Sequence, residues 1–147
     1  MKVEVKIEGD SDGFIFLQCP YCKSEFKLNI KEFEENRYDE FFCPYCGLKG
    51  KNTEFYTDEV KEQFENIIKN YMYDEINKTF GKISKDINRS KVLKMKYKPL
   101  KKVNVSDIKT EDATEEQVEC NQCKRHMKVL YCVGKSKTFC AYCGDVI

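Results

Sequence analysis

Eight of the nine cysteines in this 147-residue chain stand in pairs that are separated by two residues. A Cys-x-x-Cys turn holds two thiolates near one point, and two such turns supply the four sulfur ligands that a tetrahedral zinc ion prefers. Two pairs lie near each end of the chain. The sequence therefore predicts two zinc ions. Their predicted ligands are Cys19, Cys22, Cys43 and Cys46 at one site and Cys120, Cys123, Cys140 and Cys143 at the other.

One cysteine and the single histidine lie outside these pairs. Cys132 and His126 could each replace a ligand of the second set, which would give a site of three cysteines and one histidine. In the other interpretation both are ordinary strand residues, because four cysteines already fill the coordination shell of zinc. A filled shell leaves no position for an activated water, and one histidine allows no Ser/His/Asp set. The sequence thus predicts a protein that is not an enzyme and has no small-molecule substrate.

Pairing of the cysteines within each end is favoured over pairing across the chain. A zinc ion shared by the second and third pairs would close a loop of about 73 residues instead of about 16 to 20, at a cost on the order of 1 kcal/mol more. The two ends also form an internal repeat. Residues 42–47 (Phe-Cys-Pro-Tyr-Cys-Gly) align with residues 139–144 (Phe-Cys-Ala-Tyr-Cys-Gly), and glycine there suits a turn with positive φ.

Alternating apolar and polar residues after the first pair of each end predict strands. The apolar members are Phe26, Leu28 and Ile30 in one end and Met127, Val129, Tyr131 and Val133 in the other. Residues 14–50 and 118–147 each resemble the zinc-ribbon superfamily, of the transcription initiation factor B and rubredoxin-like types. The resemblance implies one structural zinc ion in each end. It implies no particular activity, because zinc ribbons bind nucleic acids and proteins alike.

The tetrapeptide Cys-Pro-Tyr-Cys, at residues 19–22 and 43–46, is also similar to the active site of glutaredoxins. In that fold, a thiolate of low pKa lies at the N-terminus of a helix that follows a strand. No βαβ pattern surrounds either copy here, and Gly47 follows the second copy directly. Metal binding is therefore favoured over redox catalysis.

The middle of the chain predicts one long amphipathic helix over residues 57–90. Apolar residues recur there at steps of three and four, and Thr57 is the expected N-cap. Gly81 either ends this helix or only weakens it. The apolar stripe could pack on the ribbons, or bind a partner protein or a second copy of the chain. Its members are Val60, Phe64, Ile67, Ile68, Tyr71, Met72, Ile76 and Phe80.

Residues 82–102, which we call the basic segment, contain nine basic residues and one acid. Alternation in its second half predicts a strand over residues 91–98, with one apolar face and one lysine face. Such a strand could follow a phosphate backbone, or it could be a solvated edge that lysine protects from aggregation. The candidate nucleic-acid contacts are Lys91, Lys94, Lys96, Tyr97, Lys98, Lys101 and Lys102, together with Arg125, Lys128, Lys135 and Lys137 of the second ribbon.

The predicted fold is a small, metal-stabilised α+β fold in which two ribbons bracket the helix and the lysine-rich strand. Its parts are an N-terminal ribbon (1–56), the helix (57–90), a basic strand with an acidic linker (91–117), and a C-terminal ribbon (118–147). A ribbon of roughly 30 to 40 residues buries too little apolar surface to fold by itself, so the metal must contribute folding free energy.

Charge and composition narrow the choice of partner. No segment approaches membrane-spanning length or looks like a signal peptide, and abundant cysteine without an export signal predicts the reducing cytoplasm. Eight metal-bound thiolates add −8 and two Zn²⁺ add +4 to the formal charge of +1, which gives −3, so the chain is not a globally basic nucleic-acid binder. Only three residues are arginines, so bidentate reading of guanine is scarcely available.

Two functions follow as hypotheses. The first is weakly sequence-specific nucleic-acid binding in a regulatory or accessory role, through the basic segment and the second ribbon. The alternative is an adaptor that recognises a protein through the helix stripe and the ribbon faces. Such an adaptor could belong to a transcription complex or to a bacterial toxin or phage-defence system.

Overall fold

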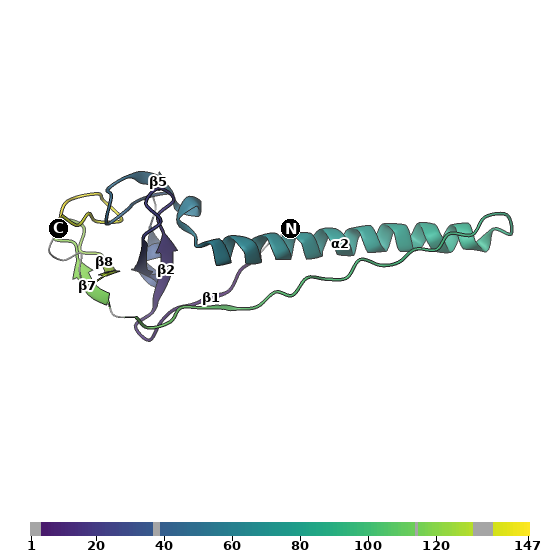
Figure 1. The fold of residues 1–147 in the computed structure, drawn as a ribbon, viewed down its shortest axis with the longest axis horizontal. Helices are drawn as coiled ribbons and strands as arrows, with labels where there is room; N and C mark the ends of the chain where they lie inside the picture. Colours follow the sequence, from purple (N-terminus) through teal and green to yellow (C-terminus); the bar gives the residue numbers. More distant parts are fainter. Residues whose placement is uncertain (1–3, 37–38, 114, 131–136) are drawn as a thin grey trace. The chain divides into compact units, whose positions relative to one another are not determined.

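The computed structural model describes residues 4–36, 39–113, 115–130 and 137–147. These residues fall into two compact units, Lys6–Val60 with Asp107–Ile147 and Lys61–Ser106 with Met1–Val5. The elements in chain order (Figure 1) are β1 (Ile7–Glu8), β2 (Phe14–Gln18), β3 (Glu25–Asn29), α1 (Ile30–Glu35), β4 (Glu40–Phe42), β5 (Lys49–Lys51), a 3-10 turn (Asn52–Phe55), α2 (Asp58–Arg89), β6 (Ile108–Lys109), β7 (Glu115–Glu119) and β8 (His126–Leu130).

Within the described ranges, the main sheet of the first unit has four strands in the order β2-β3-β8-β7. All neighbours are antiparallel, and the central pair, β3 and β8, sets Lys27 opposite Lys128. Each ribbon therefore contributes two strands to one sheet. This differs from the prediction that two separate ribbons bracket the helix. A two-stranded ribbon leaves backbone groups unpaired along its edge, and joining the two edges satisfies them.

The internal repeat is visible as reciprocal hydrogen bonds between the two ribbons. The amide of Phe42 donates to the carbonyl of Ala141 (2.8 Å), and the amide of Phe139 donates to the carbonyl of Pro44 (2.9 Å). Phe42 and Phe139 occupy equivalent places in the repeat, as do Pro44 and Ala141. The ribbons are thus related by an approximate two-fold axis that passes between β3 and β8. We call this joined unit the double ribbon.

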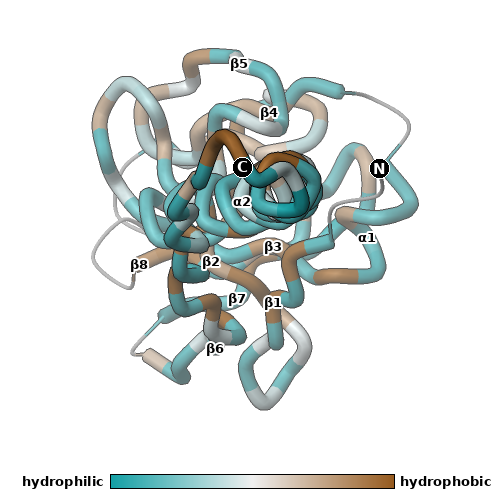
Figure 2. Tube along the Cα trace, turned by 90° about the vertical axis from the view of Figure 1, so that its right-hand side faces the viewer, coloured by the Kyte–Doolittle hydropathy of each residue, from teal (hydrophilic) through white to brown (hydrophobic). Residues whose placement is uncertain are grey.

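Aromatic rings from both ribbons form a shared core. Phe41 of β4 stacks on Phe33 of α1 (ring centroids 5.2 Å apart) and meets Phe55 and Tyr142 edge-on, at 6.3 and 5.7 Å. Apolar side chains of β2, β3 and β8 are buried with them, and these strands carry hydrophobic colour in Figure 2. Burial of this kind supplies most of the folding free energy of a small unit. The two ribbons therefore share one core as well as one sheet.

The acidic stretch that we predicted as a linker instead contributes two strands. β6 pairs with β1 in parallel, with Ile7 opposite Ile108, and β7 forms an edge of the main sheet. Ile108 and Thr110 are buried, and Val118 packs against the shared core. These residues anchor a segment whose charged composition suggested a flexible connection.

The second unit consists mainly of α2 and of the chain that returns along it (Figure 1), and we call residues 61–106 the arm. The predicted helix is confirmed. It begins where the amide of Val60 donates to the Thr57 hydroxyl (3.4 Å), and it continues through Gly81 to Arg89. The strand predicted over residues 91–98 is wrong, because this segment pairs with no strand in the part of the chain that the structure describes. Among the described residues, no helix has both the length and the apolar character of a membrane span.

Candidate metal centres and the basic arm

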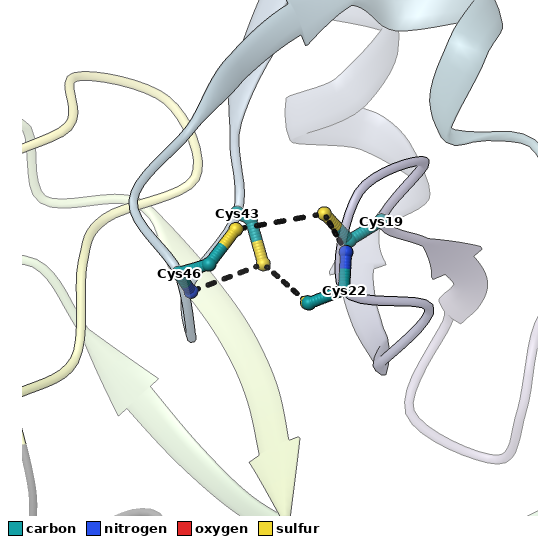
Figure 3. A group of neighbouring side chains, drawn as sticks. All are labelled: Cys19, Cys22, Cys43 and Cys46. Atoms are coloured by element: carbon teal, nitrogen blue, oxygen red, sulfur yellow. Dashed lines mark hydrogen bonds between the residues drawn. The ribbon is translucent and has the colours of Figure 1, made fainter.

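The first cysteine cluster brings together four side chains that two knuckles of the N-terminal ribbon supply (Figure 3). The Sγ atoms of Cys19 and Cys46 lie 3.7 Å apart, and those of Cys22 and Cys43 lie 3.6 Å apart. All four sulfur atoms lie within 4.8 Å of one another. Two of the thiols, Cys19 and Cys43, are buried, and Cys22 is exposed.

The second cluster repeats this arrangement. The Sγ atoms of Cys120 and Cys143 are 3.6 Å apart, and those of Cys123 and Cys140 are 3.5 Å apart. A zinc ion with Zn–S bonds of about 2.3 Å places its sulfur ligands about 3.8 Å apart, whereas a disulfide requires about 2.05 Å. The observed distances fit the metal and not the disulfide. Both four-cysteine sets could hold a metal ion, and each is formed within one ribbon, as the sequence predicted.

Backbone amides in each knuckle point toward sulfur. The amides of Tyr21 and Cys22 donate to Cys19 Sγ at 3.4 and 3.5 Å, and the amides of Tyr45 and Cys46 do the same for Cys43. This geometry requires positive φ just after the pair. Lysine adopts it in the first knuckle of each ribbon and glycine in the second, with φ of 62° and 60° at Lys23 and Lys124 and of 71° and 78° at Gly47 and Gly144.

The two knuckle glycines also have no room for a side chain. A Cβ atom on Gly144 would lie 2.9 Å from the ring of Phe42, and one on Gly47 would lie 3.1 Å from the ring of Phe139. An aromatic ring of each ribbon thus covers the metal knuckle of the other. The metal centres and the interface between the ribbons are built from the same residues.

Thiol acidity in the clusters follows burial. Burial raises the pKa of Cys43 and of Cys140 far above that of a free thiol, so their thiolates need a nearby cation. Burial also acts on Cys22, but hydrogen bonds from Ser24 and the neighbouring thiols outweigh it and lower the pKa to about 7. A metal ion supplies the positive charge that the buried thiolates require.

His126 belongs to neither cysteine cluster. Its Nδ1 lies 2.8 Å from Glu32 Oε1, and its backbone amide donates to the other oxygen of that carboxylate (2.7 Å). The histidine therefore fastens β8 to α1, which agrees with the interpretation of His126 as a strand residue. Cys132, the other candidate ligand, lies outside the described residues.

Three of the four candidate nucleic-acid contacts in the second ribbon can be placed. Lys128 is buried, and its ammonium group is engaged by Asp10 and Asp12 at 2.9 and 2.8 Å, so the prediction of a phosphate contact there is wrong. The Arg125 guanidinium lies over the Tyr142 ring (4.7 Å) and donates to Asn36 (2.9 Å). Lys137 is exposed. Lys135 lies outside the described residues.

Side-chain amides of α2 hold the returning chain in the arm. Asn70 accepts a hydrogen bond from the Val103 amide (2.7 Å) and donates to the Val103 carbonyl (2.8 Å). Asn77 pairs with Leu100 in the same way, at 2.8 and 3.0 Å. An asparagine amide offers the same donor and acceptor as a peptide group. The backbone of the extended chain therefore bonds to side-chain amides on a face of α2, in the way that the backbone of a strand bonds to a neighbouring strand.

The pairing continues toward both ends of the arm. The side chain of Gln63 accepts a hydrogen bond from the Ser106 amide (3.2 Å). The side chains of Ser84 and Asn88 both donate to the Met95 carbonyl, at 3.1 and 2.9 Å. We call this set, with Asn70 and Asn77, the amide ladder. Positions 63, 70, 77 and 84 recur every seven residues, which was the signal in the sequence that could have revealed it. The positions that oppose the first three rungs, 106, 103 and 100, recur every three, and the last rung opposes Met95, five residues before Leu100.

Helix and extended geometry explain these two periods. Seven helical residues rise about 10.5 Å, and three residues of an extended, polyproline-like chain rise about 9.3 Å. The two chains therefore stay nearly in step from one rung to the next. The ladder fixes the backbone of the returning chain and leaves the side chains between its rungs exposed, except for Tyr97, which is half-buried.

The basic segment keeps its charges at the surface. All nine of its basic side chains are exposed. Among the described residues, only Arg89 and Lys102 of these nine form ion pairs, with Asp86 (3.6 Å) and Asp74 (2.7 Å). Tyr97 also makes contacts within the arm: its hydroxyl donates to Asn77 (2.5 Å) and its ring stacks on Phe80, with centroids 5.7 Å apart. One face of Tyr97 is thus already occupied.

A pocket of about 690 Å³ lies within the double ribbon, between the strand β6 and the turn before α2. Its lining contains six carboxylates and a single lysine, Lys109. The six are Glu25, Asp58, Glu59, Asp107, Glu111 and Asp112. Such a lining repels phosphate, so the pocket is not a site for nucleic acid.

No protein-family model, no curated protein and no solved structure matches the chain. The function therefore has to be argued from the geometry of this chain alone.

Proposed function

We propose that this protein is a non-catalytic zinc protein that binds nucleic acid through the basic segment of its arm. The observation that carries the proposal is the exposure of all nine basic side chains between Lys82 and Lys102, with a local net charge of +8. Zinc ions, one in each cysteine cluster, hold the double ribbon together and take no part in chemistry. Four cysteine ligands leave the metal no open position.

The mode of binding follows from the amide ladder. Because the ladder fixes the backbone near Met95 and Leu100, the lysines between these rungs are presented on a rigid chain instead of a flexible tail. Each lysine that neutralises a phosphate releases counterions, which is the main source of affinity for nucleic acid without sequence preference. Lysine makes no bidentate contact with guanine, so we expect weak sequence specificity.

Fluorescence anisotropy with labelled single-stranded and duplex DNA and RNA of mixed sequence tests the proposal. We expect binding at low ionic strength and a steep loss of affinity with added salt. The triple variant Lys94→Glu/Lys96→Glu/Lys98→Glu should bind at least tenfold more weakly and should show a shallower salt dependence, because each phosphate contact contributes about 0.9 to the slope on duplex DNA.

A matched control variant separates the effect of where the lysines lie from the effect of the total net charge on affinity. The variant Lys31→Glu/Lys61→Glu/Lys69→Glu changes the total charge equally, but its substitutions lie outside the basic segment. If both triple variants lose the same affinity, the basic segment is not the site. Absence of binding to every probe at low salt would overturn the function itself.

Protein recognition is a second candidate function, which the exposed apolar side chains of α2 support. Phe64, Tyr71 and Met72 are 44%, 47% and 54% exposed. An adaptor of this kind would keep its partner when Lys94, Lys96 and Lys98 are replaced by glutamate. It would lose that partner when the apolar residues of the helix are replaced.

A further inference from the structure

One face of α2 carries apolar side chains that nothing in the arm covers completely. Ile68, Met72, Ile76, Thr79 and Ile83 follow one another at steps of four, four, three and four, which places them along one side of a helix. Each residue of a helix turns about 100° around the axis, and on this basis the five residues point away from Asn77 and the amide ladder. Met72 and Ile83 remain 54% and 42% exposed. We call these five residues the outer stripe.

Charge along the arm is strongly polarised. Residues 58–75 contain six acids and two lysines, a net charge of −4, whereas residues 78–102 contain ten bases and one acid, a net charge of +9. Two parallel copies of this arm would place like charges side by side. Two antiparallel copies place the acidic half of each beside the basic half of the other. A second copy of the chain thus has the complementarity that the arm requires.

The outer stripe is complementary to itself in this orientation. In an antiparallel pair centred between residues 75 and 76, Ile68 of one copy meets Ile83 of the other, and Met72 meets Thr79. At the flank of the same contact, Glu75 lies near Lys78 of the other copy. A two-fold axis repeats every one of these contacts, as a closed dimer requires. We infer that the outer stripe of α2 is the interface of an antiparallel homodimer, an inference that does not depend on nucleic-acid binding.

Light scattering coupled to size exclusion measures the mass of the zinc-loaded full chain. We expect a dimer that the variant Met72→Glu/Ile76→Glu converts to a monomer. The variant Met72→Leu/Ile76→Leu, which keeps the apolar character, should remain dimeric. Zinc content and far-ultraviolet circular dichroism verify that each variant is folded. A wild-type chain that stays monomeric at the highest attainable concentration overturns the inference.

A charge exchange tests the orientation. Glu75→Lys gives each protomer two lysines at this contact, and Lys78→Glu gives two glutamates, so either variant alone should dimerise at least tenfold more weakly. An equimolar mixture of the two should regain wild-type dimerisation as a heterodimer, because every pair again joins opposite charges. A mixture that associates no better than its components rules out the antiparallel contact. A cross-link from a photoreactive residue at position 68 should map near residue 83, and one that maps to position 68 would show parallel pairing.

Discussion

Lys27 and Lys128 lie opposite each other on the two central strands of the double ribbon, and both ammonium groups contact the same oxygen of Asp10, at 3.1 and 2.9 Å. Glu115 adds a further carboxylate at 3.0 Å from the Lys27 ammonium group. Burial raises the pKa of Asp10, but hydrogen bonds from Lys128, the Phe14 amide and Lys27 outweigh it and lower the pKa to about 2. Two like charges on the axis between the ribbons are tolerated because shared carboxylates compensate them.

Replacing the shared carboxylate tests this compensation. Asp10→Asn leaves two buried ammonium groups with a deficit of negative charge, and we expect a loss of about 3 to 5 kcal/mol in the free energy of unfolding. Chemical denaturation of the zinc-loaded protein measures it. Asp12→Asn is the control, because the Asp12 side chain is 61% exposed and should cost less than about 1 kcal/mol.

A compensating variant shows whether the stability lost in Asp10→Asn comes from unpaired charge or from altered packing. When Lys27→Met, Lys128→Met and Glu115→Gln are added to Asp10→Asn, no buried charge of the cluster is left without a partner, and much of the lost stability should return. If this quadruple variant is as unstable as Asp10→Asn alone, the loss comes from shape and not from unpaired charge.

Zinc binding at the two clusters should be coupled, because the ribbons share one sheet and one core. Cys140→Ser removes a ligand of the second cluster only. We expect the variant to hold about one zinc per chain and to bind that zinc at least tenfold more weakly than wild type does, since folding and metal binding share free energy. Competition with a chromophoric chelator measures the affinity. Unchanged affinity at the remaining site would mean that the ribbons fold independently.

The only histidine of the chain reports the contact between α1 and β8. A hydrogen bond to Glu32, opposed by partial burial and aided by the charges of Glu32 and Glu119, raises the pKa of His126 above 6.5. Its stabilising contribution is therefore fully present below pH 6.5 and is lost as the pH rises through the folded-state pKa. The single imidazole signal in a nuclear magnetic resonance titration gives this pKa directly. In Glu32→Gln the pKa should fall toward 6.5, and a pKa that does not move would exclude Glu32 as its cause.

The amide ladder predicts local opening of the returning chain. Asn77→Ala removes two hydrogen bonds to Leu100 and one to Tyr97, so hydrogen exchange at the Leu100 amide should accelerate about tenfold, as expected for the loss of roughly 1 to 2 kcal/mol. Asn77→Asp keeps the acceptor for that amide and should have a smaller effect. Equal exchange in both variants and the wild type would show that the rung does not hold the chain.

Local patterns in the sequence were sufficient to predict the two cysteine clusters and the helix α2. A Cys-x-x-Cys pair encodes its own turn, so the four ligands of each cluster follow from residues that are close together in the chain. The spacing of apolar residues likewise identified the helix. Gly81 does not interrupt it, because one glycine costs only about 1 kcal/mol in a helix of 32 residues.

The features that the sequence analysis missed depend on contacts between distant segments. Lys27 and Lys128 have the pattern of solvent-facing strand residues, and nothing near them in the chain indicates that they meet beside Asp10. The same alternation that predicted a strand over residues 91–98 also suits an extended chain that pairs with a helix. The polar side chains at positions 63, 70, 77 and 84 resemble an ordinary polar helix face until the chain that they hold is in place.

The amide ladder limits how the length of the arm can change. From Gln63 to Asn77, each step between rungs takes seven residues of α2 and three residues of the returning chain. An insertion or deletion in this part keeps the remaining rungs matched only when it adds or removes ten residues in that proportion. Each such step lengthens or shortens the arm by about 10 Å and leaves the double ribbon untouched. The length of the arm is therefore adjustable only in discrete increments.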